Sequence, residues 1–219
     1  MERAKDARWM VDRLSERFGS PTDRPRDPVE TLVLTILSQN TTDVNRDRAF
    51  ASLLERFATL AEIADARESE IADAIRVGGL QRGKAHAIRE TLRRIRAERG
   101  RFDLEFLRAM DVDAALSWLL EFDGVGRKTA GIVLLFAFGK AYFPVDTHIR
   151  RVLTRVGWIR GNEEPHDRVN GILPRDAKLM ASLHLLLIQL GRSLCRPRDP
   201  ICSECPIRER CSHGRRRAR

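Results

Sequence analysis

Apolar residues recur along most of the chain at spacings of three and four, with charged residues between them. That spacing places the apolar side chains on one face of an α-helix. The pattern occupies segments 8–18, 29–39, 49–60, 85–98, 114–122, 129–138, 148–159 and 178–190. The sequence carries no β-hairpin signal, and it therefore predicts an all-α fold.

Short clusters of Gly, Pro and Asp separate these helices, for example at 19–28 and 77–83. They are too short to be disordered linkers, so we expect the helices to pack compactly. The arginine-rich end of the chain carries no apolar pattern, and residues 212–219 are expected to form a basic tail.

The charge of the chain points to a polyanionic partner. Its 219 residues, 42% of them hydrophobic, are enough to bury a sizeable core, and the formal net charge is +9. Clustered Lys and Arg bind phosphates through charge neutralisation, which favours nucleic acid over an anionic membrane surface. No apolar run approaches the roughly 20 residues of a membrane span, and the N-terminus lacks a signal-peptide pattern. We therefore expect a cytoplasmic, nucleoid-associated protein without a membrane partner.

One candidate nucleic-acid site is the stretch FDGVGRKTAGIVLLFAF at 122–138, which predicts a helix-hairpin-helix. Gly124 and Gly126 permit positive φ and a close approach of another backbone, and the following helix directs unpaired N–H groups outward. With Val125 and Arg127, this turn would cradle a DNA phosphate. The alternative is an ordinary corner between two helices.

The candidate catalytic pair is Lys128 and Asp146. Lys128 follows Arg127 in the first turn of its helix, where positive potential favours the neutral amine that a nucleophile requires. The alternative is a surface lysine that contacts phosphate. Asp146, in FPVDTHIRRV, can act only as a helix N-cap or also as a base or partner to a cationic transition state. His148 in the same turn is expected to orient or pack rather than catalyse, and it is counted among the candidate DNA-binding residues.

The four cysteines of the chain lie in one segment of 17 residues with the spacing C-x6-C-x2-C-x5-C. They are Cys195, Cys202, Cys205 and Cys211. Clustered thiols with a C-x2-C core in a cytosolic protein indicate a tetrathiolate metal site rather than disulfides. Because both accept four thiolates, zinc and an iron–sulfur cluster stay open on chemistry alone.

Together GVGRKTA, PVDTHIRRV and the cysteine spacing resemble the endonuclease III family of helix-hairpin-helix DNA glycosylases. The resemblance covers nearly the whole chain. It implies two helical domains: a six-helix barrel at 21–138, and a domain built from 1–20 and 139–211 that carries a [4Fe–4S] cluster on the four cysteines.

By the same resemblance the protein is a bifunctional glycosylase and AP lyase of base excision repair, acting as a monomer on double-stranded DNA with damaged bases or abasic sites. Lys128 would attack C1′ of the flipped nucleotide, with assistance from Asp146. Asn40, with Gln39 beside it, and Leu80 would fill the hole left by the base. Their alternatives are a helix cap for the two amides and a core position for Leu80.

The sequence departs from the family pattern at two positions. Many relatives have Gln where this chain has Asn40, and Pro where this chain has Asp123. The aspartate at 123 would weaken DNA binding slightly or cap the next helix. Two other functions stay open: a monofunctional thymine or uracil mismatch glycosylase, and a DNA-binding protein without chemistry. The second has no need of an amine and a carboxylate facing one crevice.

Overall fold

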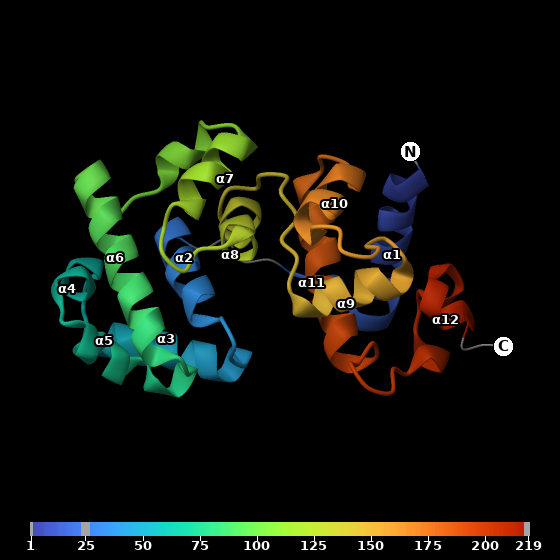
Figure 1. The fold of residues 1–219 in the computed structure, drawn as a ribbon, viewed down its shortest axis with the longest axis horizontal. Helices are drawn as coiled ribbons and strands as arrows, with labels where there is room; N and C mark the ends of the chain where they lie inside the picture. Colours follow the sequence, from blue (N-terminus) through green and yellow to red (C-terminus); the bar gives the residue numbers. More distant parts are fainter. Residues whose placement is uncertain (1, 23–26, 217–219) are drawn as a thin grey trace. The chain divides into compact units, whose positions relative to one another are not determined.

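The structure, a computed structural model, describes residues 2–22 and 27–216. Throughout these residues the regular elements are helices, and no strand is present among them (Figure 1). The all-α prediction is confirmed. The chain divides into a central unit, Pro25–Phe138, and a terminal unit, Met1–Arg24 with Gly139–Arg219.

The central unit is built around α2. Its α-helices are α2 (Pro28–Leu37), α3 (Asp43–Arg56), α4 (Leu60–Asp65), α5 (Glu68–Ala74), α6 (Gln81–Arg99), α7 (Val112–Leu120) and α8 (Arg127–Ile132). Its shorter turns are η1 (Arg76–Gly78), η2 (Glu105–Arg108) and the π-helical η3 (Val133–Ala137). α2 packs against α3, α6, α8 and η3, and Figure 1 shows it among them. It is apolar on nearly every side, as a central helix must be.

The start of α2 is fixed by its sequence. The Asp27 carboxylate accepts hydrogen bonds from the N–H groups of Val29 and Glu30, at 2.8 and 3.0 Å. Pro28 occupies the first helical position, where its missing N–H costs nothing. The helix ends at Leu37, and the Ser38–Asn40 turn follows.

The terminal unit joins α1 (Glu2–Phe18) to the C-terminal helices. These are α9 (Thr147–Val156), α10 (Pro165–Ile172), α11 (Ala177–Ser193) and α12 (Ser212–Arg216), with the short turns η4 (Cys202–Glu204) and η5 (Arg208–Arg210). α11 packs against both α1 and α9. This packing brings the N-terminal helix next to segments more than 150 residues away in sequence.

One expectation from the hydrophobic pattern was wrong. The pattern at 49–60 predicts one helix, but α3 ends at Arg56 and Thr59 caps α4 by accepting from the Glu62 N–H. The predicted basic tail is helical over its described part, α12. The Ser212 hydroxyl donates to the Val156 carbonyl at 3.0 Å, which ties α12 to the end of α9. Residues 217–219 lie outside the described residues.

Across the described ranges, no helix combines the length and the apolar character needed to cross a membrane.

Candidate active site

The hairpin between α7 and α8 holds the predicted Gly-Val-Gly turn. Gly124 has a φ of +75°, and a Cβ there would lie 3.1 Å from that of Ala87, so both conformation and space require glycine. Gly126 has a φ of −93°, so of these two glycines only Gly124 uses the positive φ that glycine permits. A Cβ on Gly126 would meet nothing within 4 Å, which leaves the start of α8 open to an approaching group. Val125 is buried and packs inward.

The Ser38–Asn40 turn is fastened to this hairpin. The side-chain amide of Gln39 donates to the Gly124 carbonyl at 2.8 Å. Gln39 therefore does not cap α2, whose C-cap residue is Ser38. Asn40 is exposed and has a φ of +49°.

The amine of Lys128 is held by a hydroxyl group. Lys128 is half-buried in the first turn of α8, and its Nζ donates to the Ser38 Oγ at 3.2 Å. The Ser38 hydroxyl donates its proton to the Thr35 carbonyl at 2.7 Å. The lone pairs of its oxygen are therefore available to accept a hydrogen bond from lysine. The sequence did not predict a role for Ser38, because a serine directly after a helix is typical of a helix cap and gives no sign of a distant partner.

Asp146 belongs to the terminal unit, where it is the N-cap of α9. Its carboxylate accepts from the Ile149 N–H at 2.7 Å and is half-buried. The capping interpretation is therefore observed. A cap fixes the carboxylate rather than excluding a second role, since the other carboxylate oxygen can still act on a substrate.

His148 packs against α11. Its Nδ1 lies 3.2 Å from the Arg151 guanidinium, which also donates to the Gly191 carbonyl at 2.7 Å. A Cβ on Gly191 would lie 2.9 Å from that of His148. The absence of a side chain at Gly191 thus lets α9, and with it Asp146, pack closely on α11.

Leu80 is not a core residue. It is 61% exposed and has a φ of +49°, a conformation that is strained for leucine. It follows Gly79 and immediately precedes α6. The described chain has three non-glycine residues with positive φ, Asn40, Leu80 and Asp199, so both predicted wedge residues have this unusual backbone. Backbone strain of this kind concentrates at functional sites.

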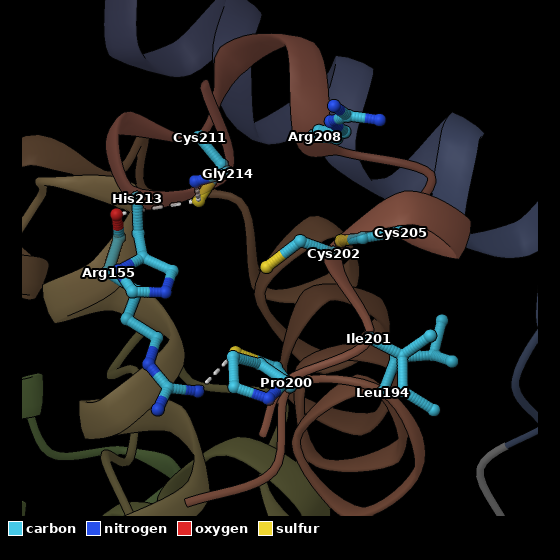
Figure 2. A pocket seen from close by; sticks show the side chains of 11 residues that line it. Arg155, Leu194, Pro200, Ile201, Cys202, Cys205, Arg208, Cys211, His213 and Gly214 are labelled. Carbon is cyan, nitrogen blue, oxygen red and sulfur yellow. Dashed lines mark hydrogen bonds between the residues drawn. The ribbon is translucent and has the colours of Figure 1, made fainter. Parts of the chain in front are cut away.

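The four cysteines line one pocket (Figure 2). None is in a disulfide, and Arg155, Arg208 and His213 are among the other residues that line the pocket. Nitrogen donors point at two of the sulfurs: the Arg155 guanidinium at Cys195 Sγ, 3.3 Å away, and the Gly214 N–H at Cys211 Sγ, 3.4 Å away. Such donors stabilise thiolates and accompany metal–sulfur centres.

Burial shapes the chemistry of these thiols. It raises the pKa of Cys205 to about 11, and it also raises the pKa of Cys211. These thiols therefore keep their protons at neutral pH unless a metal centre displaces them. Among the residues that the structure describes, no three His, Cys, Asp or Glu side chains stand close enough to share one metal ion. The spacing of the four cysteines around the common pocket is therefore too wide for one ion and is consistent with a larger group that four thiolates hold.

Comparison with known proteins identifies the class. Residues 33–173 match the model of the HhH-GPD superfamily of base excision DNA repair proteins, and the chain belongs to this superfamily. It is 37% identical over 197 residues to Endonuclease III of Thermotoga maritima, covering 88% of this chain and 86% of that protein. It is 36% identical over 193 residues to Endonuclease III of Sulfolobus acidocaldarius, covering 87% and 84%.

A solved structure agrees with these relatives. The trapped endonuclease III–DNA covalent intermediate matches with a TM-score of 0.81 and 27% identity over 99% of each chain. The resemblance inferred from the motifs is confirmed. The homology supports DNA glycosylase activity and DNA binding, and the fold is that of endonuclease III.

Proposed function

We propose that the chain is a bifunctional DNA glycosylase and AP lyase that removes oxidised pyrimidines from duplex DNA and cuts the strand 3′ to the abasic site. The observation that carries this proposal is the Lys128 amine, held half-buried at the open start of α8 by Ser38. A monofunctional glycosylase activates water and needs no such amine. The endonuclease III relative captured as a covalent intermediate with DNA supports the same reading.

The chemistry follows from the amine. The Nζ lone pair of Lys128 forms a bond to C1′ of the flipped nucleotide, while the base leaves with the electrons of the glycosidic bond and takes up a proton. Opening of the sugar ring gives a Schiff base, which makes the C2′ proton acidic. Loss of that proton and departure of the 3′ phosphate complete β-elimination, and water releases the lysine.

Asp146 is proposed to assist in two ways. Its carboxylate accepts the proton that the lysine ammonium must lose before attack, and it stabilises the positive charge that grows on the sugar as the base departs. The N-cap hydrogen bond to Ile149 holds the carboxylate in one orientation for both tasks.

The proposed DNA contacts lie on the central unit. The start of α8, with Gly126 and Arg127, would receive a backbone phosphate, because a Cβ on Gly126 would meet no atom within 4 Å and the helix N-terminus is positive. Asn40 and Leu80, exposed on two turns, would enter the duplex and replace the stacking lost when the nucleotide flips.

We propose a [4Fe–4S] cluster in the cysteine pocket, held by Cys195, Cys202, Cys205 and Cys211. When bound, it would supply a covalent cross-link that orders a segment with little apolar content of its own. Zinc is the competing occupant. Purified protein with a brown colour, visible absorbance, iron and acid-labile sulfide would support the cluster; colourless protein with stoichiometric zinc would overturn it.

Borohydride trapping tests the central step. Incubation with a duplex that contains thymine glycol or an abasic site, followed by reduction, should give a covalent protein–DNA adduct. Lys128→Ala should abolish the adduct, whereas Lys5→Ala, at an exposed lysine of α1, should retain it. An adduct that survives in the Lys128 variant would refute the nucleophile assignment.

An incision assay defines the lesion class. Duplexes carrying thymine glycol, dihydrouracil, an abasic site, uracil or G·T would be compared with and without alkali. We expect strand cleavage at the oxidised pyrimidines without alkali. Cleavage only after alkali, at uracil or G·T, would indicate a monofunctional mismatch glycosylase. Binding without base loss on every duplex would indicate a DNA-binding protein without chemistry.

A further inference from the structure

Lys84 is a buried lysine that the proposed chemistry does not use. It lies in the first turns of α6 and is 3% exposed. Its Nζ donates to the Leu37 carbonyl at 2.8 Å and to the Gly78 carbonyl at 2.8 Å. Burial lowers its pKa, so desolvation works against the charge. A methionine would fill the same volume without that cost, which indicates that the ammonium serves a purpose beyond packing.

The first of these carbonyls lies at the end of α2. The last carbonyls of a helix have no partner within it and carry the negative end of its dipole, so an ammonium stabilises them. Ser38 follows Leu37 directly and holds the Lys128 amine. Gln39 comes next and is bonded to the hairpin at Gly124. Lys84 thus fixes Leu37, the residue directly before the serine that holds the Lys128 amine.

The second carbonyl precedes Leu80. Gly78 ends η1 and is buried, and its Cα lies so close to α3 that an added Cβ would stand 3.2 Å from that of Ala49. Gly79 follows, and then Leu80 projects outward. One ammonium therefore joins two turns that are 41 positions apart in sequence, at Leu37 and Gly78. Leu37 lies three residues before Asn40 and Gly78 lies two residues before Leu80, and both of these exposed residues have positive φ.

We infer that Lys84 is a positioning residue that clamps the Leu37 and Gly78 carbonyls together. The clamp sets the position of the Lys128 amine through Ser38, and it sets the position of Leu80 relative to that amine. The inference rests on the proposed function, because the amine and the exposed leucine are its working parts. Misplacement of a reacting group by an ångström costs about a hundredfold in rate, so a clamp of this kind has a large effect on catalysis.

The test compares Lys84→Met, which removes the donors, with Lys84→Gln, which keeps an N–H donor without the charge. Lys5→Met on α1 is the matched control. Single-turnover borohydride trapping on a preformed abasic duplex, at saturating protein, measures the placement of Lys128 without the base-release step. We expect about a ten- to hundredfold slower trapping in Lys84→Met, partial recovery in Lys84→Gln, and an unchanged rate in the control. Affinity for undamaged duplex should stay the same.

Amide hydrogen exchange of the DNA-free protein supplies a readout that needs no activity. Lys84→Met should speed exchange in Ser38–Asn40 and Gly79–Gln81 together while α2 and α6 stay protected. Trapping at the wild-type rate in Lys84→Met, or exchange that rises uniformly over the central unit, would overturn the positioning role. If the wild-type protein forms no adduct at all, the proposed function fails. If Lys84→Met then still speeds exchange only in the two turns, Lys84 is a structural clamp without a role in catalysis.

Discussion

Replacing Gly191 with alanine tests how α9 is held. A Cβ at this position would lie 2.9 Å from the Cβ of His148 and 3.3 Å from the Arg151 guanidinium. The guanidinium can move aside, but the His148 Cβ is fixed to the α9 backbone. Because ordinary contact begins at 3.4 Å, α9 and α11 must separate locally by about 0.5 Å to admit the methyl group.

The magnitude follows from two opposing effects. Overpacking a well-packed contact costs about 1–3 kcal/mol. Alanine in place of glycine inside a helix returns about 0.5–1 kcal/mol. Gly171 in α10 provides the control, since a Cβ there would meet nothing within 4 Å. The helix-propensity gain applies to both variants, so Gly191→Ala should be less stable than Gly171→Ala by about 1–3 kcal/mol.

Urea unfolding followed by far-ultraviolet circular dichroism, on both variants in one buffer, gives this difference from the midpoints and a common slope. Base release should also slow in Gly191→Ala, because α9 carries Asp146 at its first turn, and should be unaffected in Gly171→Ala. Equal midpoints for the two variants would show that α9 and α11 do not approach this closely and would refute the reasoning.

Four further substitutions test the roles of single residues. Asp146→Asn keeps a good N-cap but removes the charge, so melting should barely change while base release falls about a hundredfold or more; retained activity would reduce Asp146 to a cap. Gly124→Ala should destabilise the fold by about 1 kcal/mol or more, whereas Gly126→Ala should leave stability intact and weaken DNA binding in a titration. The Glu68 hydrogen bond raises the pKa of His86, so the charged pair stabilises the fold at low pH and its contribution is lost as pH rises through that raised pKa. In an NMR titration Glu68→Gln should lower the pKa of His86; an unchanged value would contradict the pairing.

Much of this fold is predictable from local sequence. An aspartate ahead of an apolar helix marks the start of α2 and α9, at Asp27 and Asp146, and both caps are observed. The apolar periodicity locates the long helices, and the glycines at 124 and 126 mark the hairpin. These signals are local because each involves residues within one turn of helix.

The parts that sequence did not predict depend on distant partners. Lys84 bonds to a carbonyl 47 residues away, and Lys128 to a hydroxyl 90 residues away. The π-helical turn that extends α8 looks identical to an α-helix in its apolar spacing. α12 was missed because its stability comes from contacts with α9 rather than from an apolar face of its own.

The two lysines of the central unit show how the ends of helices assign roles to one chemical group. Lys84 donates to the Leu37 carbonyl at the end of α2, where the negative potential of the helix end favours the ammonium against the cost of burial. Lys128 stands in the first turn of α8, next to Arg127, and donates to the Ser38 hydroxyl. An ammonium forms strong hydrogen bonds but has no lone pair with which to attack a sugar. A neutral amine has that lone pair but is a weaker hydrogen-bond donor. The proposed clamp and the proposed nucleophile are bonded to adjacent residues, Leu37 and Ser38, so a cation that holds the first residue can set the position of the amine that is bonded to the second.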